Sequence, residues 1–186
     1  MPKYFIGTLL ESQQNDQQIE IATDVADRYG LPYMYDRVVP HITLVGAFEW
    51  ESAYPNLVLE SIRQQVGNFP FGMLERSDLF SYKNKLGYSL AWRYVPKRGA
   101  KELIGTICDT VRMHGITVAK ENDAVLHSLH SRIIQNVPDI VQFQKAKNYV
   151  EREYRLHNSP FRIFSVILFL WDQDRWIIPK GGKLLF

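Results

Sequence analysis

The chain has 186 residues, of which 46% are hydrophobic and 23% charged, and its formal net charge is +2. This apolar fraction is too high, and this net charge too small, for an intrinsically disordered chain. The length fits one domain that buries about 70% of its unfolded surface and folds without a metal or disulfide, so we expect residues 1–186 to form a single domain.

Strand-like and helix-like segments alternate along the chain. The first strand is predicted at residues 3–10 and the first helix at residues 16–28, where Gly30 suits the helix end and Pro32 blocks its continuation. The further segments are, in chain order, a strand at 38–48, a helix at 57–66, a hairpin of strands 69–82 and 86–95, a helix at 101–114, a strand at 124–134, a helix at 138–154, and strands at 161–171, 175–178 and 183–186.

This order predicts an α+β domain. Helices interleave with strands, but the chain also contains hairpins, which do not suit a doubly wound parallel sheet. Two similar halves are expected, each with a histidine-bearing strand that is followed directly by a helix.

The cysteine content and the lengths of the apolar segments indicate in which cellular compartment the chain is expected. The single cysteine, Cys108, cannot form a disulfide within the chain, which favours a reducing compartment, and its helical surroundings suggest a packed side chain instead of a nucleophile. The apolar run at residues 4–10 is short and has no cleavage signal, and the run at 161–171 is shorter than the roughly 20 residues of a membrane-spanning helix. We therefore expect a cytoplasmic monomer that does not enter a membrane.

The first candidate site lies in the strand that contains His41. Alternate residues of a strand face opposite sides. One face would carry Val39, His41, Thr43 and Val45, and the other, more apolar face would carry Pro40, Ile42 and Leu44. An imidazole with a hydroxyl two residues later can transfer a proton and hydrogen-bond a bound oxyanion. A purely structural histidine on a strand is the alternative.

The second candidate strand contains His127 and His130, and only one of them can face a cleft with this chemistry. With His130 toward the cleft, Ser128, Arg132 and Ile134 would join it, while His127, Leu129, Ser131 and Ile133 face the core. With His127 toward the cleft, Leu129 would accompany it and adds no polar chemistry. We favour His130, because Arg132 is a permanent cation and a bidentate phosphate ligand.

Two histidines with phosphate ligands suit the cleavage of a phosphodiester. One neutral imidazole would activate a water or a 2′-hydroxyl, and the other, protonated, would donate to the leaving oxygen. Thr43 and Arg132 would hold the non-bridging oxygens and offset the developing charge. The ligand spacing typical of zinc sites, the phosphate-binding glycine loops and the nucleophile elbow are all missing from the sequence, so we predict no cofactor and no metal.

These residues resemble the motifs of the 2H phosphoesterase superfamily, which includes the RNA 2′,3′-cyclic phosphodiesterases. That superfamily carries two H-x-T/S motifs, each on a strand. Pro40-His41-Ile42-Thr43-Leu44 is a full first motif, and His130 follows His41 after 89 residues, or His127 after 86. The second motif departs from the pattern, because Arg132 stands where a Thr or Ser is expected. The resemblance covers the whole chain and implies two α+β lobes, related by pseudo-symmetry, whose antiparallel sheets face a central cleft with the helices outside.

The resemblance implies a metal-independent phosphodiesterase with His41 and His130 as catalytic residues and Thr43 and Arg132 as phosphate ligands. Its substrate would be an RNA end or a small nucleotide: a 2′,3′-cyclic phosphate, or a 2′,5′-linked or cyclic oligonucleotide. Two alternatives stay open. The chain could bind RNA or a nucleotide without turnover, or it could mediate protein contacts through an aromatic surface built from Trp50, Trp92, Trp171 and Trp176.

Overall fold

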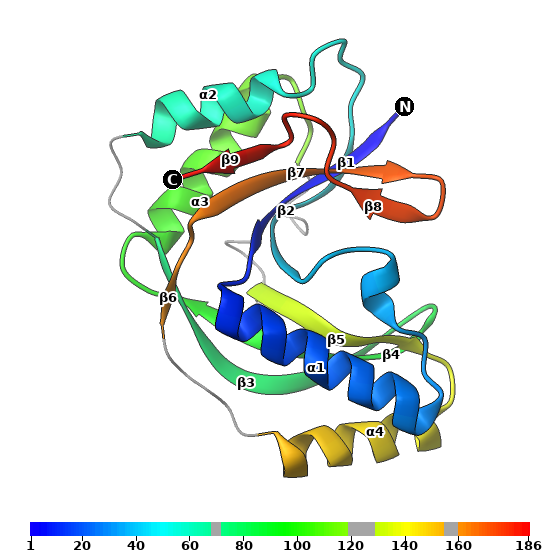
Figure 1. Cartoon of the computed structure of the whole chain (residues 1–186). Helices are drawn as coiled ribbons and strands as arrows, with labels where there is room; N and C mark the ends of the chain where they lie inside the picture. Colours follow the sequence, from blue (N-terminus) through cyan, green and yellow to red (C-terminus); the bar gives the residue numbers. More distant parts are fainter. Residues whose placement is uncertain (68–71, 119–128, 155–159) are drawn as a thin grey trace.

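The computed structural model describes residues 1–67, 72–118, 129–154 and 160–186. Within these residues the chain forms two antiparallel sheets and four α-helices (Figure 1). The elements are, in chain order, β1 (Lys3–Leu9), α1 (Ser12–Tyr29), the 3-10 helix η1 (Met34–Asp36), β2 (His41–Glu49), α2 (Leu57–Val66), β3 (Met73–Asn84), β4 (Gly87–Pro96), α3 (Ala100–Met113), β5 (Leu129–Val137), α4 (Ile140–Glu153), β6 (Phe161–Arg162), β7 (Ser165–Asp172), β8 (Arg175–Ile177) and β9 (Lys183–Leu185).

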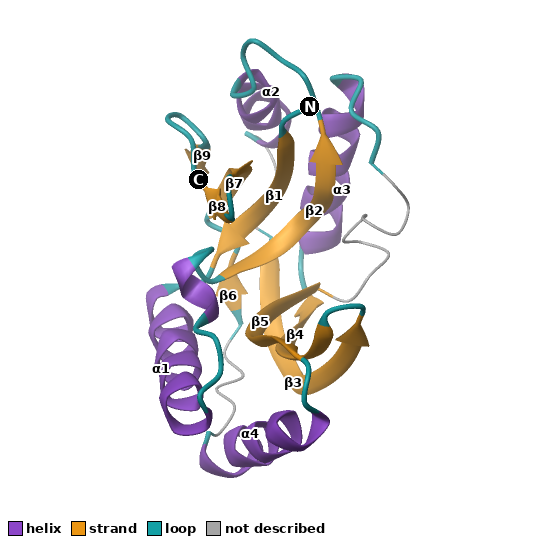
Figure 2. Cartoon of the chain, turned by 90° about the vertical axis from the view of Figure 1, so that its right-hand side faces the viewer, coloured by secondary structure: helices purple, strands orange, loops and turns teal. Residues whose placement is uncertain are grey.

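Each sheet is covered by its own pair of helices. The first sheet has the strand order β2-β1-β7-β8, with β9 also paired to β7, and the second has the order β5-β4-β3-β6. Helices α2 and α3 pack on the first sheet, and α1 and α4 pack on the second, at opposite ends of the molecule in Figure 2. The predicted α+β fold, with two antiparallel sheets and helices outside, is confirmed.

The helix ends follow local signals where the sequence carries them. Helix α2 has the predicted bounds, and α1 ends at Gly30, whose φ of +61° favours glycine. Helix α1 begins at Ser12 instead of residue 16. The first turn adds the buried Gln14, and the buried face of α1 also carries Gln18; these polar residues interrupt the apolar pattern from which the prediction was made.

A hydrophobic core runs between the helices and the sheets. On α3, Leu103, Ile104, Ile107 and Val111 recur at the spacing that places them on one face of the helix, and all four are buried. Burying one such side chain stabilises the fold by about 1.5–3 kcal/mol. Cys108 lies in the same core, as expected for a packed cysteine.

The single strand predicted at residues 161–171 is wrong, because this segment contributes to both sheets. β6 pairs with β3 in the second sheet, whereas β7 pairs with β1 in the first sheet. Between the two strands, the backbone N–H of Ile163 donates to the carbonyl of Gly72 at 2.8 Å. Phe161, Ile163 and Val166 are all buried, so the apolar pattern continues across the crossover and hides it from the sequence.

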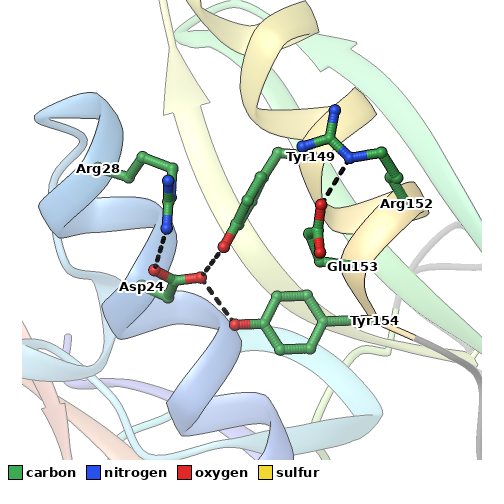
Figure 3. A network of polar contacts seen from close by, with 6 residues as sticks. All are labelled: Asp24, Arg28, Tyr149, Arg152, Glu153 and Tyr154. Carbon is green, nitrogen blue, oxygen red and sulfur yellow. Dashed lines mark hydrogen bonds and ion pairs between the residues drawn. The ribbon is translucent and has the colours of Figure 1, made fainter.

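Asp24 joins α1 to the end of α4 (Figure 3). Its Oδ2 accepts hydrogen bonds from the hydroxyls of Tyr149 at 2.6 Å and Tyr154 at 2.8 Å. Arg28, one turn further along α1, lies 3.6 Å from Asp24 Oδ1 and 4.4 Å above the ring of Tyr149. The hydrogen bond from Tyr149 holds the pKa of Asp24 below its usual value, although burial acts in the opposite direction.

Candidate active site

The four predicted site residues meet in one pocket. His41 and Thr43 come from β2 of the first sheet, whereas His130 and Arg132 come from β5 of the second. The pocket between them is narrow, with a volume of about 10 Å³, and is lined by Met34, Tyr35, His41, Thr43, His130, Ser131 and Arg132. His127, the alternative second histidine, lies outside the residues that the structure describes.

The strands β2 and β5 present their motifs in the same way. Thr43 pairs with Gly7 of β1, and Arg132 pairs with Ala91 of β4, so a small residue stands opposite the third position of each motif. At Gly7 the space is tight, because a Cβ there would lie 2.9 Å from the carbonyl oxygen of Ile42 and 3.3 Å from ring carbons of Phe169 and Phe5. A larger residue at position 7 would therefore collide with the backbone of β2 and with the rings of Phe5 and Phe169.

A β-bulge follows each motif. Because of these bulges, two residues face a different side of the strand from the one predicted. Val45 pairs with Ile6, and it is buried in the main core with Ile42 instead of sharing the face of His41. Ile134 pairs with Leu90 and is buried, instead of joining His130. In both strands the register shifts by one residue just after Thr43 or Arg132, and an extra residue in one strand turns the next side chains to the opposite face, until a second shift further along each pair.

His41 is buried, and its ring orientation is defined by the backbone. Its Nδ1 lies 2.8 Å from the carbonyl oxygen of Val39. Because a carbonyl only accepts hydrogen bonds, Nδ1 carries the proton and Nε2 is left as the proton acceptor. The imidazole packs against the rings of Phe5 and Phe169, with centroids at 4.8 Å and 5.2 Å.

Burial lowers the pKa of His41 to about 3. The positive charges of Arg132 and His130 act in the same direction, whereas the hydrogen bond to Val39 opposes the change. His41 is therefore neutral at pH 7 in the empty pocket. A phosphodiester anion bound beside it would offset the charges of Arg132 and His130 and bring the pKa of His41 back toward its ordinary value.

His130 sits against an aromatic wall on the second sheet. The rings of Phe80 and Tyr82, on β3, contact the imidazole edge-on with centroids at 5.7 Å and 5.8 Å. The two rings also stack on each other at 5.7 Å, and the guanidinium of Arg93 covers Phe80 at 4.8 Å. Arg93 is the residue opposite His130 in the sheet and pairs with Asp78 at 3.7 Å. This wall restricts the orientation of the His130 ring.

Two residues that the sequence did not indicate hold the second motif from behind. The amide of Gln18 on α1 donates to the carbonyl oxygen of Arg132 at 2.9 Å and also contacts the hydroxyl of Ser131. The hydroxyl of Tyr35 donates to the same carbonyl at 2.5 Å, and burial raises the pKa of this phenol. A polar Gln18 on the same face of α1 as Ile21 and Val25 was the only available signal.

The other features considered from the sequence are a metal site, a membrane-spanning helix and a surface of tryptophans. Among the residues that the structure describes, no group of three His, Cys, Asp or Glu side chains could hold a metal ion, and no helix has both the length and the apolar character to cross a membrane. Trp92 is buried in the main core, Trp50 packs against it, and Trp176 packs on Phe5 beneath His41. The four tryptophans therefore do not form one surface.

The fold and the paired histidine strands define the class of this chain, which has the 2H phosphoesterase fold. A solved phosphoesterase matches 98% of this chain and 95% of its own, at 14% identity and a TM-score of 0.60. E. coli LigT complexed with NADP+ matches 100% of this chain and 94% of its own, at 14% identity and a TM-score of 0.57. Kluyveromyces marxianus Usb1 with uridine monophosphate matches 100% and 98%, at 14% identity and a TM-score of 0.51. No protein-family model and no curated protein matches the sequence.

Proposed function

We propose that the chain is a phosphodiesterase that hydrolyses a 2′,3′-cyclic phosphate, or a 2′,5′-linked or cyclic oligonucleotide, without a metal ion. The observation that carries this proposal is one pocket that unites His41 and Thr43 from one sheet with His130 and Arg132 from the other. Proteins of the same fold have been solved as a phosphoesterase and with nucleotides bound, among them LigT with 3′-AMP and Usb1 with uridine monophosphate. We expect a phosphate group to occupy this pocket.

His41 is the general base of the proposed reaction, and His130 is the general acid. His41 is neutral and its Nε2 is the acceptor, so it takes a proton from water while the water oxygen bonds to phosphorus. The bond from phosphorus to one ribose oxygen breaks, and His130 gives its proton to that oxygen. Since one proton is taken and one is given, the two histidines exchange protonation states during one turnover.

Arg132 and Thr43 bind the non-bridging oxygens in this scheme. Within the described part of the chain, Arg132 has no carboxylate partner, so its charge is available to a phosphate. The guanidinium offers two parallel donors, and the hydroxyl of Thr43 offers one more. Charge stabilisation, which a metal ion provides in other phosphoryl-transfer sites, falls to Arg132 in this pocket.

Hydrolysis in the presence of EDTA tests the proposal. The substrates are a nucleoside 2′,3′-cyclic phosphate, a 2′,5′-linked dinucleotide and a cyclic dinucleotide, with product formation measured by chromatography. His41→Ala and His130→Ala should each lower kcat by about 100-fold or more, the usual contribution of a positioned acid or base.

His114→Ala is the matched control, because that histidine forms a hydrogen bond with Ser61 on the far side of the first sheet. Activity that survives in both variants would disprove the assignment, and loss in His127→Ala instead of His130→Ala would select the other register.

A chain that binds a nucleotide without turnover is the second candidate function. The specific observation in its favour is Arg132, which is bulkier than a Thr or Ser and carries charge into a pocket of only about 10 Å³. Tight, salt-sensitive nucleotide binding with no product would support it. In that case, Arg132→Thr should create turnover by restoring the hydroxyl, whereas in an active enzyme the same substitution should weaken phosphate binding.

A further inference from the structure

A larger pocket lies directly beside the histidine pocket. Its volume is about 190 Å³, and Met34 lines both pockets. The other lining residues are Pro32, Tyr33, Arg37, Gln135 and Asn136. This volume is below the roughly 300–1,000 Å³ of pockets for drug-sized ligands, so the pocket suits a smaller ligand such as the base of a nucleoside, whereas the histidine pocket, at about 10 Å³, admits only a compact group.

Hydrogen bonds to other elements hold both walls of this larger pocket. On the η1 side, the hydroxyl of Tyr35 donates to the Arg132 carbonyl, and the backbone N–H of Trp176 donates to the carbonyl of Arg37 at 2.8 Å. On the β5 side, Asn136 has a φ of +57°, a conformation that asparagine tolerates better than most residues. Its Oδ1 accepts from Asn84 at 3.0 Å. The pocket is therefore formed before any ligand binds.

The lining residues offer the contacts that a nucleoside uses. Tyr33 presents a half-buried ring whose edge packs on Tyr35 at 5.7 Å and 86°, and aromatic rings stack on any base. The amide of Gln135 can both donate to and accept from the edge of a base. Among the described residues that line the pocket, only Arg37 carries a full charge, and that charge is positive. The lining thus favours a ligand with an aromatic base and an anionic group.

We infer that this pocket binds the nucleoside whose phosphate lies between His41 and His130, an inference that rests on the proposed function. The base stacks on Tyr33 and is read by Gln135. Arg37 lies where it can meet a further phosphate on the same nucleoside. The substrate class is then a ribonucleotide or RNA end with a recognised base, and a phosphodiester without a base is a poor substrate.

The aromatic wall beside His130 is the competing place for the base. Its rings already have partners, because Phe80 stacks on Tyr82 and lies beneath Arg93, and both rings hold His130 edge-on. A base could stack there only by displacing one of these contacts. The larger pocket requires no such rearrangement, and for this reason the geometry favours it.

The experiment compares a substrate with a base and the same substrate without one. Each of the four nucleoside 2′,3′-cyclic phosphates is measured against 1-O-methylribose 2,3-cyclic phosphate, and the readout is the ratio of their kcat/KM values. We expect Tyr33→Ala to lower this ratio by about 10-fold through loss of stacking, mainly in KM, whereas Tyr33→Phe retains it. Gln135→Ala should reduce the differences among the four bases.

Matched controls and a binding measurement separate the two proposals. Tyr54→Ala and Gln144→Ala change exposed residues of the same types and should keep the wild-type ratios. Unchanged ratios in both Tyr33→Ala and Gln135→Ala, or a ratio lost in Tyr82→Ala instead, would overturn the inference while hydrolysis itself persists. Should the wild type hydrolyse none of the substrates, the proposed function fails. The inference is then decided by calorimetry, in which Tyr33→Ala must weaken 3′-AMP binding more than ribose 3-phosphate binding.

Discussion

At the scale of single residues, His41 shows how a strand position becomes a proton acceptor. The carbonyl of Val39 takes the Nδ1 proton, and the rings of Phe5 and Phe169 remove the imidazole from water. Both effects leave a neutral ring with Nε2 as its acceptor. The ring of His130 on β5 packs against the edges of Phe80 and Tyr82. The two imidazoles therefore stand in different surroundings even though their strands present them in the same way.

The buried His41 makes stability depend on pH in mild acid. Its pKa is about 6.5 when unfolded and falls to about 3 on folding. Between these values the unfolded chain binds a proton that the folded protein does not, so this contribution is present above about pH 6.5 and is lost as the pH falls toward 3. The free energy of unfolding changes through one such group by at most about 1.4 kcal/mol per pH unit.

Urea unfolding between pH 7 and pH 5 should show this loss of stability in the wild type and a smaller loss in His41→Gln. His114→Gln serves as the control, and equal slopes in the wild type and His41→Gln would contradict the burial argument.

At the scale of elements, α1 supports the site at one end and the helical layer at the other. Gln18 reaches the backbone of β5 at Arg132, and Asp24, almost two turns later, accepts from the hydroxyls of Tyr149 on α4 and of Tyr154 directly after it. One helix therefore links β5 to α4; Figure 3 shows the contacts at the Asp24 end. We expect a loss of packing between α1 and α4 to reach the pocket through Gln18.

Replacement of Asp24 by asparagine should destabilise the protein at neutral pH. The ion-dipole contacts with Tyr149 and Tyr154 and the pair with Arg28 would weaken, at a cost of about 1 kcal/mol for a partly exposed carboxylate. Because the pKa of Asp24 is lowered from 3.8, this stability is present above that value and is lost as the pH falls below it. The difference between the wild type and Asp24→Asn, measured by urea unfolding, should therefore shrink in strong acid. Asp27→Asn, an exposed change on the same helix, should lie near the wild type at every pH, and a gap that persists in acid would argue against the role of the charge.

At the scale of the whole molecule, the sequence predicts those features of the fold and site that depend on residues close together in the chain. His41 with Thr43, and His130 with Arg132, share a face because strands alternate, and this holds before each bulge. The facing of Val45 and Ile134 depends instead on Gly7 and Ala91, which belong to partner strands distant in the sequence. The crossover at Ile163 likewise depends on which strands β6 and β7 find as partners. Tyr35 is brought to the site by the three-residue 3-10 helix η1, which is too short for a periodic pattern to mark it.

Because the pocket takes residues from both sheets, a bound phosphate should stabilise the whole molecule and not one lobe alone. A ligand that binds only the folded protein at 100 times its Kd adds about 2.7 kcal/mol of stability. For a chain of this size that corresponds to a rise in Tm of roughly 5–10 °C. We expect 3′-AMP to produce this shift in the wild type by calorimetric scanning, with a single transition. Arg132→Ala should abolish most of the shift, because it removes the cation that we propose as the phosphate ligand, whereas Arg63→Ala on the exposed face of α2 should keep it. Two transitions, of which only one moves with 3′-AMP, would mean that the ligand is held by one sheet and that the shared pocket is not its site.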